Sequence, residues 1–278
     1  MDISVFAIVI FAAALHATWN AIVKGGSDTL LTTVLVTGAA ALLATVCLPF
    51  LTAPARESWP FIAASAVFQI VYFVLVARAY HLADMSLTYP LMRGTAPLLV
   101  ALASVIWLSE PLSASAWLGL GVICAGILSM AGAIPRGANR AGIVPALGNA
   151  VVIAGYTLID GAGVRRSHAP AAYTLWIFLL SGTALSAWAL ARSRRSFGSY
   201  VRRNWHLGLI GGAGTVGSYG LALWAMSVAP IAVVAALRET SILFGTAISA
   251  LLLHERVGRA RIVGVGIIAT GAILLRLA

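Results

Sequence analysis

The second half of this chain repeats the first. Placing Arg93 over Arg238, an offset of 145 residues, brings five further identities into register without a gap. They are Thr95 with Thr240, Glu110 with Glu255, Gly119 with Gly264, Gly121 with Gly266, and Gly126 with Gly271. So many identities at one offset indicate that one structural unit has been used twice. A site that serves the whole chain is therefore expected where the two units meet.

The composition makes lipid the solvent for most of this chain. Its residues are 61% hydrophobic and 9% charged, with a mean hydropathy of +0.98, whereas a soluble domain carries roughly 25% charged residues. The net charge of +10 does not indicate a nucleic-acid partner, because the basic residues lie in short loops between apolar runs. Cys47 and Cys124 lie inside apolar stretches, so neither a disulfide nor a metal site is predicted.

A membrane-spanning helix needs about 20 mostly apolar residues, and ten such runs can be drawn. They lie near 3–23, 29–51, 58–79, 85–108, 114–133, 142–163, 170–190, 205–226, 230–253 and 259–277. The first run follows Asp2 and no Lys or Arg, so we expect a retained helix rather than a signal peptide. The segment Pro135–Arg140 divides the chain into two five-helix units, residues 1–134 and 141–278.

Five helices per unit is an odd number, so the two units enter the membrane from opposite sides. The predicted fold is therefore all-α and integral to the membrane, with ten transmembrane helices in two inverted five-helix repeats. Loop charges indicate the orientation. Twelve Lys and Arg residues fall on the side of Lys24, against four on the other side. The basic side is predicted to be cytoplasmic, with both termini outside.

Two matched segments carry a family resemblance. Leu108-Ser109-Glu110-Pro111-Leu112 leads to Gly119 and Gly126, and His254-Glu255-Arg256-Val257 leads to Gly264 and Gly271. A glutamate at a helix turn, followed by a glycine-spaced helix in each repeat, resembles the drug/metabolite transporter superfamily, in particular its EamA-type two-repeat, ten-helix exporters. The resemblance implies a central cavity lined by the helices at 3–23, 58–79, 85–108, 142–163, 205–226 and 230–253.

The resemblance also implies that the helices at 114–133 and 259–277 form the scaffold. Their glycines form seams of small residues, which favour close helix packing or a homodimer face. Glu110 and Glu255 lie at helix ends near water, and turn capping is the interpretation we favour for both.

Arg93 and Arg238 are the most informative candidate site residues. Each lies about eight residues, or roughly 12 Å, into its helix, where an unpaired arginine costs at least about 2.5–3.5 kcal/mol. Two readings remain open. The arginines belong to a structural ion-pair network with Glu239 and Asp160, or they bind an anionic group such as a carboxylate. Pro90 and Pro97 flank Arg93 and are expected to distort its helix.

Other polar and aromatic residues extend this candidate site. His16, Trp19 and Asn20 share one helix face through their i, i+3, i+4 spacing; they line the cavity, or His16 only bonds to a neighbouring helix. Four tyrosines are further candidates, although aromatic residues near helix ends are often interfacial anchors. They are Tyr72, Tyr89, Tyr156 and Tyr219.

The predicted function is a secondary transporter that exports a small polar metabolite, an amino acid or another carboxylate, across the cell inner membrane by alternating access. Its partners are a small-molecule substrate, the lipid bilayer and a proton, with His16, Asp160 and Glu239 as the coupling candidates. No cofactor is predicted, and no enzyme motif such as HExxH occurs. The alternative is an integral-membrane enzyme or lipid-handling protein, and a structural subunit of another complex is a weaker one.

Overall fold

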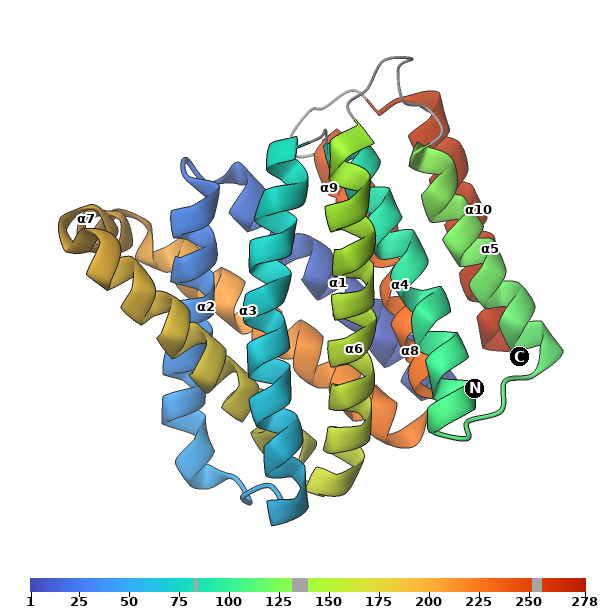
Figure 1. Cartoon of the computed structure of the whole chain (residues 1–278), viewed down its shortest axis with the longest axis horizontal. Helices are drawn as coiled ribbons and strands as arrows, with labels where there is room; N and C mark the ends of the chain where they lie inside the picture. Colours follow the sequence, from blue (N-terminus) through green and yellow to red (C-terminus); the bar gives the residue numbers. More distant parts are fainter. Residues whose placement is uncertain (83–84, 132–139, 252–256) are drawn as a thin grey trace.

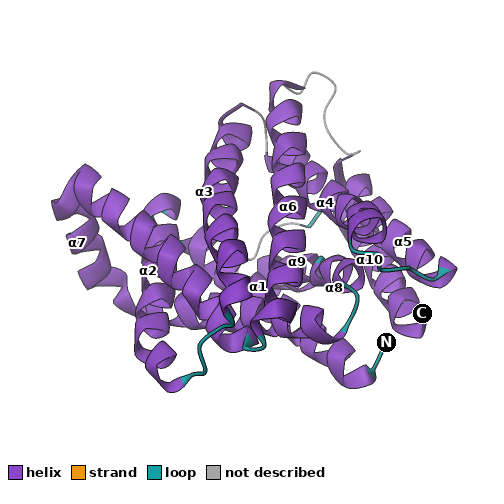
Figure 2. Cartoon of the chain, turned by 60° about the horizontal axis from the view of Figure 1, so that its bottom comes forward, coloured by secondary structure: helices purple, strands orange, loops and turns teal. Residues whose placement is uncertain are grey.

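Ten α-helices make up most of the described chain (Figure 1). The computed structural model describes residues 1–82, 85–131, 140–251 and 257–278, and these ranges are helical apart from short loops (Figure 2). The helices are α1 (Ile3–Gly25), α2 (Thr29–Cys47), α3 (Trp59–Leu82), α4 (Met85–Trp107), α5 (Ala114–Ala131), α6 (Ile143–Ser167), α7 (Pro170–Val228), α8 (Ile231–Arg238), α9 (Ser241–Leu251) and α10 (Arg259–Leu277).

The predicted all-α membrane fold is confirmed. Within the described ranges, eight helical stretches are long and apolar enough to cross a membrane, and Ala114–Met130 is a shorter apolar helix. Capping explains where the first two helices begin. The Asp2 carboxylate accepts from the Ser4 amide at 2.8 Å, and the Asp28 carboxylate accepts from the Leu31 amide at 2.9 Å, which satisfies amides that have no partner within the helix.

Helix α7 corrects the sequence prediction at 191–204, where a loop was expected between two spans. The structure is helical throughout Pro170–Val228, yet the helix folds back on itself. Gly182 faces Thr37 and Ala41 of α2, and Gly212 faces Ala39 and Ala40 of the same helix. Thirty residues of straight helix would separate these glycines by about 45 Å. The two predicted spans are thus two arms of α7, which meet at the left of Figure 1.

The helix break near the two arginines lies in the second half of the chain, between α8 and α9, and not beside the prolines of α4. Helix α4 runs continuously from Met85 to Trp107 with Pro90 and Pro97 inside it. The corresponding span of the second half is instead interrupted between α8 and α9. The Glu239 and Thr240 amides donate to the carbonyls three residues earlier, at 3.1 and 3.0 Å. Such a tight turn within a span is often found at functional hinges.

Helices of the first half of the chain pack against helices of the second half, in matched pairs. Helix α4 packs on α6, and correspondingly α9 packs on α1. Helix α3 packs on α6, and the second arm of α7 packs on α1, where Gly214 meets Trp19. Helices α5 and α10 pack on each other at the right of Figure 1, at the opposite side of the molecule from α2 and α7. The core helices between these flanks hold the polar site.

The glycine seams of α5 and α10 face each other inside the chain. A Cβ atom on Gly119 would lie 3.1 Å from the Gly271 carbonyl oxygen, and one on Gly271 would lie 2.8 Å from the Gly119 carbonyl oxygen. The absence of side chains is what lets these two backbones touch. By contrast, a Cβ on Gly121 or Gly266 would meet nothing within 4 Å. The described contacts of the seam are therefore within one chain, and a homodimer stays a prediction.

Candidate functional site

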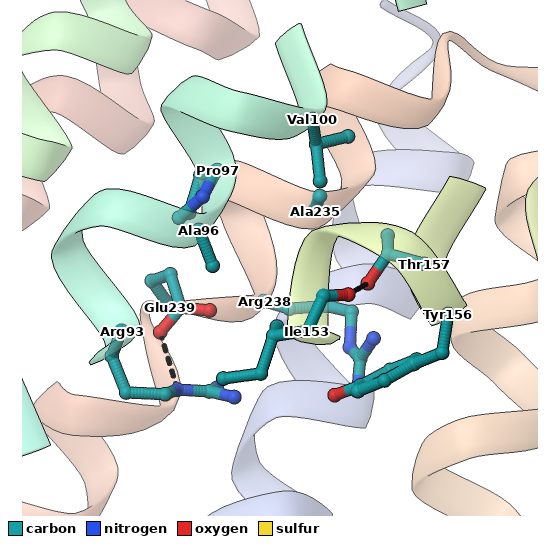
Figure 3. Close-up of a pocket in the computed structure, with 10 residues that line it drawn as sticks. All are labelled: Arg93, Ala96, Pro97, Val100, Ile153, Tyr156, Thr157, Ala235, Arg238 and Glu239. Atoms are coloured by element: carbon teal, nitrogen blue, oxygen red, sulfur yellow. Dashed lines mark hydrogen bonds and ion pairs between the residues drawn. The ribbon is translucent and has the colours of Figure 1, made fainter. Parts of the chain in front are cut away.

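A small polar pocket lies where α4, α6 and α8 meet (Figure 3). Its volume is about 10 Å³, which is room for about one water molecule. Its walls carry both repeat-related arginines and an acidic residue. The lining residues are Arg93, Ala96, Pro97, Val100, Ile153, Tyr156, Thr157, Ala235, Arg238 and Glu239. Three of the nine predicted substrate-binding residues, Arg93, Tyr156 and Arg238, thus border one space.

The first arginine already has a counter-ion. The Arg93 Nε atom lies 2.9 Å from the Glu239 Oε2 atom, and both side chains are less than 10% exposed. Glu239 reaches this position from the tight turn that ends α8. The pair joins α4 to the α8–α9 break, and it balances the charge of Arg93 inside the protein.

The second arginine is held differently. Arg238, the last residue of α8, places its guanidinium carbon 5.1 Å from the centre of the Tyr219 ring. It is half-buried, and it forms no ion pair with any carboxylate in the part of the chain that the structure describes. A ring face attracts a cation but carries no charge to neutralise it. Arg238 therefore keeps a positive charge at the pocket.

The Asp160 carboxylate is enclosed by three hydroxyl groups. Asp160 is fully buried on α6 and accepts hydrogen bonds from Ser65 Oγ at 2.8 Å, from Tyr173 at 3.0 Å and from Tyr219. These donors come from α3 and from both arms of α7. The Tyr219 side chain thus contacts Asp160 with its hydroxyl and Arg238 with its ring face.

The remaining predicted site residues are not part of the pocket wall. The Tyr72 ring is packed edge-to-face against Tyr156, with 6.2 Å between ring centres. Tyr89 is half-buried against the core. His16 and Trp19 are packed edge-to-face at 5.2 Å, and the Trp19 indole nitrogen is buried with no acceptor among the described residues. Asn20 is exposed, and its amide donates to the His16 carbonyl at 2.7 Å.

A second polar cluster joins the two halves near the α4–α5 loop. The Arg165 guanidinium, on α6, donates to the Glu110 carboxylate and to the carbonyls of Met226 and Ala229, at 2.8 and 2.9 Å. The other Glu110 oxygen accepts from the Ile231 amide at 3.1 Å. Arg165 thus covers the carbonyl end of α7, and Glu110 covers the amide end of α8. We call this cluster the latch.

Glu110 caps a distant helix rather than its own turn. Ser109 has a φ of 53°, and this left-handed residue turns the chain so that the Glu110 amide bonds back to the Ser104 carbonyl at 3.2 Å. The carboxylate then points toward α8. Capping is thus part of its role, as the sequence suggested, but the capped helix belongs to the other half. Glu255, its counterpart, lies outside the described residues.

An open vestibule of about 450 Å³ lies beside the latch, lined by Glu57, Leu108, Ala162, Arg165, Arg166 and His168. Along α6, Arg165 is eight residues beyond Thr157 of the pocket, or about 12 Å. Between them, Gly161 leaves room for the side chain of Ile231. The vestibule and the pocket are therefore separated by the latch and by this packing contact.

Sequence reasoning missed Ser65, Tyr173 and Arg165. Ser65 is 95 residues from Asp160, and no local pattern marks such a distant partner. Arg165 resembled an ordinary loop residue at the end of an apolar run. Its one signal was its place on the side with few basic residues, where a juxtamembrane arginine is less expected.

Together, these features define an integral-membrane protein of paired helical halves with a charged pocket between them. The model of the EamA-like transporter family matches residues 3–132 and 140–277, and the chain belongs to this family. The protein is thus a membrane transporter, because the members of this family are transporters and not enzymes. No curated protein sequence matches it. One crystal structure is similar over 99% of this chain and 98% of its own length, with a TM-score of 0.75 and 20% identity; this likeness bears on the fold alone.

Proposed function

We propose that the protein exports a small metabolite with a carboxylate group across the cell inner membrane by alternating access. One observation carries the proposal. Arg238 borders the pocket between the halves and forms no ion pair with a carboxylate of the described chain, while Arg93 is paired with Glu239. A buried guanidinium is stabilised by a planar anion that accepts two of its N–H groups. Arg238 is then the anion-binding residue, and Arg93 is the structural one.

The surroundings of Arg238 suit the rest of such a substrate. Tyr156 and Tyr219 supply apolar ring surface beside the guanidinium. Away from the pocket wall, on α1, the buried Trp19 N–H has no acceptor among the described residues, and a polar substrate atom would satisfy it. A pocket of about 10 Å³ holds no metabolite. Residues 1–134 and 141–278 therefore have to move relative to each other before a substrate can bind.

Purified protein in liposomes tests this function. A thermal-shift panel of amino acids and other carboxylates identifies the substrate, because a ligand at about 100 times its Kd stabilises the fold by about 2.7 kcal/mol. Flux of the stabilising compound into or out of vesicles supports transport. Its conversion to a product without flux would show an enzyme instead.

Replacing Arg238 by Gln is expected to lower substrate affinity by roughly 10- to 100-fold, because a hydrogen bond to a charged group contributes about 1.5–3 kcal/mol. The thermal-shift titration measures this. Arg238→Lys should recover only part of the affinity, since an ammonium cannot form the paired contact. The exposed Arg259→Gln variant is the control for loss of one positive charge. Equal affinities in the Arg238→Gln and Arg259→Gln variants would remove Arg238 from the site.

The termini are expected on the outer side of the membrane, outside the cytoplasm. Twelve basic residues against four favour this orientation, which places the latch and vestibule on the outer side. A reporter that is active only outside the cytoplasm, fused after Ala278, should be functional. A functional cytoplasmic reporter at the same point would reverse the orientation.

A further inference from the structure

Asp160 lies in the membrane-spanning part of α6 with hydroxyl groups as its only described partners. Its relative exposure is 0%, and no basic side chain in the described ranges forms an ion pair with it. The groups that face it are Ser65 from α3, Tyr173 and Tyr219 from α7, Arg238 of α8 beyond the Tyr219 ring, and Tyr156 one turn away on α6 itself. A buried carboxylate in a membrane without a counter-ion is costly and is usually functional.

This set of partners suits two protonation states. An ionised carboxylate only accepts hydrogen bonds, whereas a protonated one also donates. A Ser or Tyr hydroxyl both donates and accepts. Rotation of one O–H bond therefore adapts the three hydroxyl groups around Asp160, which we call the cage, to a bound proton. The guanidinium partner of Glu239 has no acceptor. A proton on Glu239 would therefore break its contact and leave Arg93 without a counter-ion. Asp160 can therefore bind a proton and keep its hydrogen-bond partners, whereas Glu239 cannot.

Tyr219 connects Asp160 to the anion-binding residue. Its hydroxyl donates to the Asp160 carboxylate, and its ring face carries the Arg238 guanidinium at 5.1 Å. One positive charge therefore serves both Asp160 and the pocket. An anion that binds to Arg238 takes up this charge, which leaves Asp160 less stabilised as a carboxylate and favours its uptake of a proton.

We propose that Asp160 is a proton-binding site that is loaded together with the carboxylate substrate on Arg238, through the shared Tyr219. The inference rests on the proposed transport function and specifies its coupled ion. Of the three coupling candidates in the sequence, it selects Asp160 in preference to Glu239, which is paired with Arg93. Anion and proton then cross together, so that one negative and one positive charge move in each cycle.

Infrared spectroscopy tests the site with the proton itself as the probe, and no substrate is needed. Wild-type protein in lipid should gain a buried carboxylic-acid band as the pH is lowered, and Asp160→Asn should lose that band. The exposed Glu57→Gln variant is the matched control and should keep it. If Asp160→Asn does not fold, Asp160→Glu makes the same assignment, because it displaces the band in frequency. A band that is unchanged in the Asp160 variants overturns the proposal.

Arg238→Gln tests the coupling in the same assay, because it imitates neutralisation of the guanidinium by an anion. The Asp160 band should then form at a pH higher by about one unit or more. A midpoint that stays in place, or that moves to lower pH, overturns the coupling between Arg238 and Asp160. Because the readout is protonation alone, these results are separate from any failure to find a transported carboxylate.

Discussion

Replacing Glu239 by Ala should destabilise the protein by about 3–5 kcal/mol, because it leaves the buried Arg93 guanidinium without a counter-ion. The Arg93 and Glu239 side chains are both less than 10% exposed, and their 2.9 Å contact joins α4 to the α8–α9 break. A loss of this size is a large share of the stability of a typical protein. It should be visible as a reduced folded yield and a lower Tm in detergent.

The control is the double variant Arg93→Met/Glu239→Leu. Apolar residues of similar size often replace a buried ion pair at little cost, so this protein should regain most of the lost stability. If Arg93→Met/Glu239→Leu is as unstable as Glu239→Ala, packing rather than charge holds this contact together. If Glu239→Ala is as stable as the wild type, the pair contributes nothing to the fold.

Adding a single methyl group to the α5–α10 seam should also have a large effect, and its sign should depend on the glycine chosen. In Gly271→Ala the new Cβ lies 2.8 Å from the Gly119 carbonyl oxygen and 2.8 Å from the Ile123 amide nitrogen. Both atoms belong to the backbone of α5, so the helices have to separate. Overpacking of this kind costs about 1–3 kcal/mol, and the Tm should fall.

Gly266→Ala is the matched control on the same helix. Its Cβ meets nothing within 4 Å, and alanine is the better helix former by up to about 1 kcal/mol. The Tm should therefore stay the same or rise. A fall in Tm with Gly266→Ala alone would indicate that this face of α10 packs against a second copy of the chain.

The spans were predictable from the sequence because they follow from apolar runs. Helices α1, α4 and α10 begin and end within a few residues of their predicted positions. The helical connection between the two arms of α7 was not predicted, because the 191–204 segment is polar yet helical. The prolines do not mark the one helix break described near the arginines. Pro90 and Pro97 lie inside an unbroken α4, whereas the α8–α9 break at Glu239 contains none.

The candidate site could be predicted only in part from the sequence. Arg93 and Arg238 stood out because a charge deep in an apolar run is costly, and the repeat brought them into register. The sequence did not show which arginine is paired, because the two occupy equivalent positions in the repeats. Only the side-chain contacts show that Glu239 forms its ion pair with Arg93. The cage around Asp160 and the latch consist of pairs between distant segments, which leave no periodic pattern in the chain.

The latch groups several hydrogen bonds that only water could replace if it separated. It satisfies two carbonyls of α7, the first amide of α8 and one pair of opposite charges. When Glu110 and Arg165 separate, all of these groups lose their partners together, and lipid offers none in return. Only water entering from the vestibule replaces those hydrogen bonds. If the alternating-access cycle proposed above opens this end of the molecule, water would therefore have to enter as the latch separates.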